Sequence, residues 1–217
     1  MSRAATDSHT GDIPAIGVLV SGRGSNLQAI FNAIERGELR AHVTIVISSR
    51  HDAFALQIAA AHGAACHVIV PRDYPSRAEA GAAIVDALRA AGVRLVVLAG
   101  YKPILDACVV RAFPNAIINI HPSLLPAFAG GMAPRPQTEA LEAGVKITGC
   151  TVHFVTEKVD AGPIIAQAAV PVLDDDDVET LSARILVEEH RLLPHAVGLA
   201  LSGRLKVEGQ RVVIAAE

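Results

Sequence analysis

The strongest constraint on the fold is a series of short, continuously apolar runs that are rich in valine and isoleucine. The runs begin near Ile16, Val43, Cys66, Val93 and Ala116, and segments of helical periodicity separate them. A strand that is apolar on both of its faces is typical of a parallel sheet with helices packed on either side. The pattern therefore predicts an α/β fold with a doubly wound, mostly parallel sheet flanked by helices.

The length of the chain favours one domain. Its 217 residues, 51% of them hydrophobic, suffice for one core and leave little room for a second. The first residues are polar, and no apolar segment follows Arg3 as it would in a signal peptide. We therefore expect a disordered tail over residues 1–14 and a single domain over residues 15–217.

The charge and the cysteines exclude several classes of protein. The formal net charge is −3 and the basic residues are scattered, so the basic stripe of a nucleic-acid-binding protein is missing. The apolar stretches fall short of the roughly 20 residues that span a bilayer. Cys66, Cys108 and Cys150 lack C-x-x-C spacing, and the nine histidines lack a metal-binding spacing. We expect a cytoplasmic protein without a membrane anchor, a nucleic-acid partner or a metal.

A glycine-rich loop follows the first apolar run. Residues 21–28 read Ser-Gly-Arg-Gly-Ser-Asn-Leu-Gln, and apolar residues then recur at helical spacing as far as Gly37. We expect Ser25 to cap this helix, with Gln28 completing a capping box. Glycines let a ligand approach the backbone, and the free amides at a helix start favour a phosphate. The motif is neither G-x-G-x-x-G nor a P-loop, so a monophosphate fits best; the alternative is a tight turn that merely needs glycine.

A second motif lies where the fifth apolar run gives way to a proline-rich loop. Residues 119–126 read Asn-Ile-His-Pro-Ser-Leu-Leu-Pro. Ligands of open α/β sheets bind beyond the carboxyl ends of the strands, and Asn119 and His121 point the same way if strand alternation continues. An amide and a protonated imidazole aimed at one carbonyl oxygen would stabilise a tetrahedral oxyanion, which indicates acyl transfer. The alternative is that both side chains only hydrogen-bond the loop.

The third motif is a strand that runs into an acidic turn. Residues 148–163 read Thr-Gly-Cys-Thr-Val-His-Phe-Val-Thr-Glu-Lys-Val-Asp-Ala-Gly-Pro. In this order and spacing, the three motifs resemble those of the glycinamide ribonucleotide formyltransferase family of purine synthesis, and the resemblance covers about residues 16–205. It implies transfer of a formyl group from 10-formyltetrahydrofolate, a co-substrate, to the amine of glycinamide ribonucleotide, without a metal.

The resemblance also implies catalytic roles. His121 matches the catalytic imidazole, Asn119 matches the residue that holds the formyl oxygen, and Asp160 matches the carboxylate that raises the pKa of the histidine. A nearby carboxylate favours the imidazolium and keeps a proton available near neutral pH. Without the resemblance, Asp160 would be interpreted as a turn residue before Gly162.

Two substrate sites follow from the resemblance. On the ribonucleotide side it implies that the phosphate binds Gly24, Ser25 and Asn26, and that the ribose hydroxyls bind Glu189. On the folate side it implies Arg77, Lys102, Pro103, Ile104, Leu105, Asn119, Thr156, Glu157 and Asp160. By periodicity alone, Glu189 would be the solvated face of an amphipathic helix over residues 182–201 that is interrupted at Pro194, and Arg77 the first turn of a helix capped by Ser76.

The chain departs from the family pattern in two places. Lys102 and Pro103 stand where the family commonly has methionine and a basic residue, and proline has no N–H to offer a pterin. Residues 128–137 form a longer run that lacks the family's histidine. This run is interpreted as a longer loop, either a lid over the site or surface variation without a role.

Other polar residues receive structural interpretations. Four aspartates over residues 174–177 precede a helical pattern and are expected to supply its N-cap. Cys150 and His153 lie three apart on a strand and so face opposite sides, which rules out a local Cys–His nucleophile pair. His153 is expected to be structural and near the site.

Two kinds of rival function remain open. Methionyl-tRNA formyltransferase and formyltetrahydrofolate hydrolase use the same folate, but both usually carry a further domain for which this length leaves no room. A non-catalytic nucleotide-binding module would need the loop at residues 21–26 but not Asn119, His121 and Asp160 together. The sequence leaves open whether the protein is a monomer or a homodimer.

Overall fold

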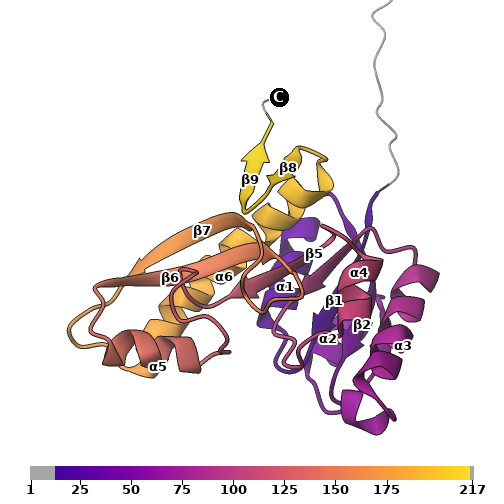
Figure 1. Cartoon of the computed structure of the whole chain (residues 1–217), viewed down its shortest axis with the longest axis horizontal. Helices are drawn as coiled ribbons and strands as arrows, with labels where there is room; N and C mark the ends of the chain where they lie inside the picture. Colours follow the sequence, from indigo (N-terminus) through magenta and orange to yellow (C-terminus); the bar gives the residue numbers. More distant parts are fainter. Residues whose placement is uncertain (1–12, 216–217) are drawn as a thin grey trace, which may run out of the picture.

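The computed structural model describes residues 13–215 and forms one continuous nine-stranded sheet in the order β3-β2-β1-β4-β5-β6-β7-β9-β8 (Figure 1). The strands are β1 (Ala15–Val20), β2 (His42–Ser48), β3 (Ala65–Val68), β4 (Leu95–Leu98), β5 (Ile117–His121), β6 (Ile147–Phe154), β7 (Ile164–Pro171), β8 (Leu205–Glu208) and β9 (Arg211–Ile214). The helices are α1 (Ser25–Glu35), α2 (Ala55–Ala61), α3 (Arg77–Ala90), α4 (Ala107–Ala112), α5 (Arg135–Glu142) and α6 (Val178–Leu201), with a short 3-10 helix η1 (Pro71–Asp73). Most of the predicted tail, residues 1–12, lies outside the described residues.

The first five strands are parallel throughout, and they are the five apolar runs of the sequence. Each begins within two residues of the expected position. The chain winds outward from β1 to β2 and β3, then returns to place β4 and β5 on the other side of β1. The predicted doubly wound α/β fold is confirmed, and its topological switch point lies between β1 and β4, where ligands of such sheets bind.

An antiparallel extension continues the sheet beyond β5. The predicted strand of the third motif is β6, which runs antiparallel to both β5 and β7. The hairpin of β8 and β9 joins the edge of β7 through a parallel pairing of Ile164 with Arg211. The sheet is therefore mostly parallel on the amino-terminal side and mixed on the carboxyl-terminal side (Figure 1).

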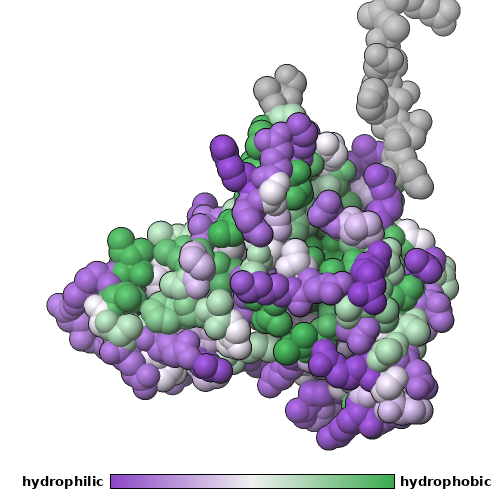
Figure 2. All heavy atoms as spheres, viewed as in Figure 1, coloured by the Kyte–Doolittle hydropathy of each residue, from purple (hydrophilic) through white to green (hydrophobic). Residues whose placement is uncertain are grey.

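Two hydrophobic cores cover the two faces of the sheet. Ile16 and Val18 of β1 pack in one core with residues of α1 and α6, whereas Leu19 packs in the other core with α3. Burial on both faces explains why β1, β2, β4 and β5 are continuously apolar. In the space-filling view, hydrophilic side chains dominate the periphery of the face and hydrophobic ones gather around β6 and β7 (Figure 2).

The start of α1 differs from the prediction. Ser25 is the first residue of the helix rather than its cap, and the N-cap is Gly24, whose φ of 79° is in the left-handed region that favours glycine. The Gln28 amide donates to the Oδ1 atom of Asn32, so the expected capping box is wrong. The predicted stop is confirmed, because the helix ends at Glu35, two residues before Gly37.

Helix α6 begins earlier than predicted and is not interrupted. Asp177 caps it in a reciprocal capping box with Thr180, which confirms the N-cap expected from the aspartates. Pro194 lies inside the continuous helix, so the predicted break is wrong. Pro194 is buried beside Leu193, and this packing holds a helix that a proline would otherwise break.

The expected N-cap of α3 is confirmed, because Ser76 accepts a hydrogen bond from the Glu79 amide. Within residues 13–215, no helix is long and apolar enough to cross a membrane.

Candidate active site

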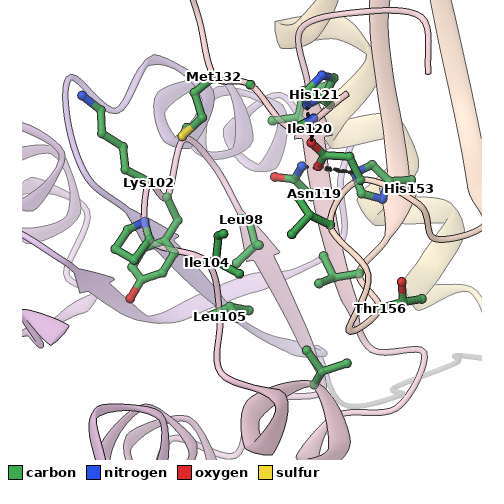
Figure 3. A pocket seen from close by; sticks show the side chains of 18 of the residues that line it. Leu98, Lys102, Ile104, Leu105, Asn119, Ile120, His121, Met132, His153 and Thr156 are labelled. Carbon is green, nitrogen blue, oxygen red and sulfur yellow. Dashed lines mark hydrogen bonds and ion pairs between the residues drawn. The ribbon is translucent and has the colours of Figure 1, made fainter. Parts of the chain in front are cut away.

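A cavity of about 170 Å³ lies near the switch point. Residues near the carboxyl ends of β4, β5 and β6 line it. Its wall brings together the second and third motifs and the segment after β4, which are far apart in the sequence (Figure 3). The side chains of Asn119 and His121 project from the same face of β5, as strand alternation predicts, and both line the cavity. Asp160 joins them from the acidic turn after β6.

His121 is held by an acceptor at each ring nitrogen. Its Nδ1 lies 3.4 Å from Oδ2 of Asp160, and its Nε2 lies 3.1 Å from the carbonyl oxygen of Phe128. The residue is 2% exposed, so no more than a trace of solvent reaches it. The two acceptors therefore hold the imidazole ring in a fixed orientation within the cavity.

The acidic turn aims the Asp160 carboxylate into the cavity. Asp160 has a φ of 48°, an uncommon conformation for a non-glycine residue, and its Oδ2 also accepts a hydrogen bond of 2.8 Å from the Gly130 amide. The turn lies tight against β6, since a Cβ at Gly162 would stand 1.8 Å from the carbonyl oxygen of Phe154. Glycine is therefore required where the turn returns to the sheet.

His153 fixes the orientation of Asn119. Its Nδ1 lies 2.9 Å from the carbonyl oxygen of Phe154, and its Nε2 lies 3.2 Å from Nδ2 of Asn119. Burial lowers the pKa of His153, so the neutral ring donates from Nδ1 and accepts the Asn119 amide at Nε2. The second hydrogen on Asn119 Nδ2 remains available to a ligand.

The role of His153 is the part of the site that sequence reasoning missed. Cys150 is in the core whereas His153 lines the cavity, which confirms that the two face opposite sides. The pairing with Asn119 spans 34 residues of sequence, and only the antiparallel register of β5 and β6 places the two directly opposite. A signal did exist, because strand alternation puts His153 on the face that Cys150 avoids.

The long loop after β5 forms part of the cavity wall. Phe128 and Gly130 contact His121 and Asp160 through their backbones, and Met132 lines the cavity. The first part of the run at residues 128–137 therefore lies at the cavity, and whether it acts as a lid or has no role stays a prediction. The last three residues of this run are not loop, since α5 begins at Arg135.

The folate-side residues of the sequence prediction divide into two groups. Eight of the nine line the cavity: Lys102, Pro103, Ile104, Leu105, Asn119, Thr156, Glu157 and Asp160. Arg77 does not; its guanidinium donates a 2.8 Å hydrogen bond to the carbonyl oxygen of Ile104, against the segment that separates it from the cavity.

The predicted ribonucleotide residues lie apart from this cavity, at the start of α1. Glu189 of α6 is only 7% exposed, and its carboxylate accepts a 2.7 Å hydrogen bond from Asn26. The alternative of a solvated helix surface is therefore wrong for Glu189. Burial raises the pKa of this carboxyl, although the Asn26 hydrogen bond opposes the shift. The Oδ1 atom of Asn26 is buried and has no hydrogen-bond partner within the described part of the chain.

No cluster of histidine, cysteine or carboxylate side chains within residues 13–215 has the geometry to hold a metal ion.

Comparison with known proteins gives consistent matches over this fold. Residues 15–197 match the model of the formyl transferase family. The trifunctional purine biosynthetic protein adenosine-3 of Gallus gallus is 44% identical over 192 residues, which are 88% of this chain and 19% of that protein. The chain thus spans about a fifth of the length of that relative.

Two relatives match over nearly their whole length. Phosphoribosylglycinamide formyltransferase of Escherichia coli strain K12 is 37% identical over 202 residues, 90% of this chain and 94% of that protein. The crystal structure of glycinamide ribonucleotide transformylase 1 from Symbiobacterium toebii superposes with a TM-score of 0.91 at 52% identity, covering 95% of this chain and 96% of that one.

Proposed function

Because the chain belongs to the formyl transferase family, we propose that it transfers the formyl group of 10-formyltetrahydrofolate to the amine of glycinamide ribonucleotide, a step of purine biosynthesis. The products are N-formylglycinamide ribonucleotide and tetrahydrofolate. The observation that carries this proposal is the single cavity that Asn119, His121 and Asp160 share with an apolar wall.

The first chemical step is attack of the amine on the formyl carbon. The carbonyl oxygen becomes negatively charged in the tetrahedral intermediate and needs donors that are already in place. Asn119 supplies the Nδ2 hydrogen that His153 does not use, and His121 supplies a second donor once the oxygen displaces the Phe128 carbonyl from Nε2. Loss of one such donor typically costs a factor of about 10² to 10³ in rate.

Proton transfer completes the reaction. The attacking amine becomes positively charged and must lose a proton, whereas the folate nitrogen must gain one before the bond from carbon to nitrogen breaks. The imidazolium of His121 delivers a proton to the leaving nitrogen, and the ring is reprotonated at the expense of the amine. Asp160, whose Oδ2 lies 3.4 Å from Nδ1 of His121, stabilises the positive charge on the ring whenever the ring is protonated.

The ribonucleotide is proposed to bind at the start of α1. The free backbone amides of Gly24, Ser25 and Asn26 would hold the phosphate. The buried Glu189 carboxylate and the unpartnered Oδ1 of Asn26 would accept hydrogen bonds from the ribose hydroxyls. Buried polar atoms without partners are costly in a folded chain, and a polyhydroxyl ligand would satisfy these.

The folate is proposed to lie along the cavity wall formed by Ile104 and Leu105, near Thr156 and Glu157. Lys102 and Pro103 line the same cavity, although Pro103 offers no N–H to the pterin. We propose that Arg77, whose guanidinium donates to the carbonyl oxygen of Ile104, binds a carboxylate of the folate at the outer edge. The folate is a co-substrate of the proposed reaction.

We infer a cytoplasmic protein that acts as a monomer or a homodimer without a metal.

Hydrolysis of formyltetrahydrofolate is the alternative, since water could replace the amine against the same three residues. The buried Glu189 and Asn26 favour transfer, because hydrolysis has no use for a second polar site. The test is to incubate the protein with both substrates and follow tetrahydrofolate together with the formylated ribonucleotide. Formation of tetrahydrofolate without the ribonucleotide would establish the hydrolase instead.

A further inference from the structure

A buried hydroxyl ties the two proposed substrate sites together. Ser21 directly follows β1 and precedes residues 22–26, called here the phosphate loop, and it is 2% exposed. Its Oγ accepts a 2.8 Å hydrogen bond from the backbone N–H of Lys102 and lies 2.6 Å from Oγ of Ser49. The loops that follow β1, β2 and β4 therefore meet at this hydroxyl.

The hydrogen bond places Lys102 beside the phosphate loop. Strands β1 and β4 are parallel neighbours, with Leu19 paired to Leu98, so the loops that follow them leave the sheet side by side. Lys102 is anchored to Ser21, three residues before Gly24. Pro103 restricts the backbone of Lys102 to extended conformations, which limits the positions that the side chain can reach.

The Lys102 side chain is directed away from the chemistry of the cavity. In the close-up its ammonium extends away from Asn119 and His121, and also away from the wall at Ile104 (Figure 3). Lys102 is exposed, and no carboxylate within residues 13–215 forms an ion pair with it. Lys146 and Lys206, in contrast, pair with Asp174 and Glu208.

The proposed phosphate site needs such a cation. Backbone amides and a helix dipole carry only partial charges, whereas a phosphate monoester carries nearly two negative charges near neutral pH. The phosphate loop itself holds a basic residue, Arg23, which is exposed on the side of β1. Lys102 would supply a second charge from the side of β4.

We propose that the Lys102 ammonium binds the phosphate of the ribonucleotide, not the folate, so that the lysine at this departure from the family pattern belongs to the other substrate. This inference rests on the proposed function, since it assumes that the phosphate binds at Gly24, Ser25 and Asn26. Lys102 nevertheless remains one of the residues that line the proposed folate cavity.

The test compares a ligand with and without its phosphate. Calorimetry measures binding of glycinamide ribonucleotide and of the corresponding dephosphorylated riboside to the unmodified chain and to Lys102→Met, without folate present. We expect the substitution to weaken ribonucleotide binding about tenfold, as for loss of a charge-assisted hydrogen bond, and to leave riboside binding unchanged. Lys146→Met removes the same charge from a distant pair and should change neither affinity.

The affinity of the Lys102→Met variant for the folate shows whether the lysine serves that substrate instead. If Lys102→Met weakens binding of 10-formyltetrahydrofolate and leaves the ribonucleotide unaffected, the lysine serves the folate and the inference is overturned. Equal weakening of the ribonucleotide and the riboside would overturn it too, because the effect would not depend on phosphate. Failure of the proposed function is a separate outcome, namely an unmodified chain that forms no formylated product from the two substrates.

Discussion

The cavity around His121 and the site at the start of α1 differ in how their polar groups are satisfied. In the cavity, His121, Asn119 and Asp160 are all held by partners from the chain itself. At α1, Glu189 has a single side-chain partner and Oδ1 of Asn26 has none within the described residues. Under the proposed function, the groups assigned to the chemistry are thus fixed in advance, whereas the groups assigned to binding are left for a ligand to complete.

The largest effect that this contrast predicts is on turnover at His121. Replacing His121→Ala removes both the proton donor and a donor to the oxyanion, so kcat should fall by a factor of about 10³ or more. Ribonucleotide affinity should stay within about twofold, because α1 and Glu189 lie outside the cavity. Steady-state kinetics and calorimetry measure the two quantities, and unchanged turnover would refute the mechanism.

A smaller loss of turnover should follow at His153, which orients Asn119 without touching the substrate. His153→Phe keeps a ring but removes the acceptor for the Asn119 amide, so kcat should fall about tenfold to a hundredfold while substrate affinities hold. His153→Gln should recover part of the loss, because its amide oxygen can replace Nε2 as acceptor. A purely structural role would instead lower thermal stability in both variants without separating their kcat values.

Replacing Glu189 beside α1 should weaken binding of the ribonucleotide and at the same time stabilise the fold. Glu189→Gln should raise the KM for the ribonucleotide about tenfold, since a neutral amide is a weaker acceptor for ribose hydroxyls.

The same variant should melt at a higher temperature than the unmodified chain near neutral pH. Because burial raises the pKa of Glu189, its contribution to stability is full below the unfolded pKa and is lost as pH rises through the folded one. The gap in melting temperature should therefore widen from pH 5 to pH 8. If the difference in melting temperature narrows over this range, the fold stabilises the charged carboxylate of Glu189 and the prediction is wrong. Glu142→Gln, on the surface of α5, is the control and should show no such dependence on pH.

The smallest effect should come from a position outside both regions. Asp177→Ala removes the N-cap of α6 and should lower the free energy of unfolding by about 1 kcal/mol. Urea denaturation measures the change. Because Glu189 lies more than two turns along the same helix, the affinity for the ribonucleotide should not change with the stability. A loss of affinity together with the loss of stability would mean that the start of the helix controls the binding site.

The sequence predicted the parallel half of the molecule more closely than the mixed half. Continuous apolar runs mark β1, β2, β4 and β5 because both faces of those strands are largely buried, whereas the edge strand β3 is exposed. No expectation was made for β7, in which buried and exposed residues alternate, or for β8 and β9, which are short and largely exposed. Local rules also failed at Pro194, where packing of the surrounding helix outweighs the preference of one residue.

For the site, residue identities could be predicted and their partners could not. The motifs pointed to Asn119, His121 and Asp160, and the structure brings these three to one cavity. The backbone carbonyl of Phe128 and the amide of Gly130 carry no side-chain signature, so no pattern could have assigned them to His121 and Asp160. The buried state of Glu189 likewise depends on how α6 packs against α1, which helical periodicity alone does not specify.

The antiparallel pairing of β5 with β6 has a consequence for how the enzyme could be divided or rearranged. Asn119 faces His153 directly across that pair, and His121 faces Thr151. A shift by a single position would turn one member of each couple to the opposite side of the sheet. A fragment ending after β5 would contain the Asn119 amide and the His121 imidazole but not the residues of β6 that orient them. Circular permutants and split halves should therefore be active only if they restore the pairing of β5 with β6 in this register.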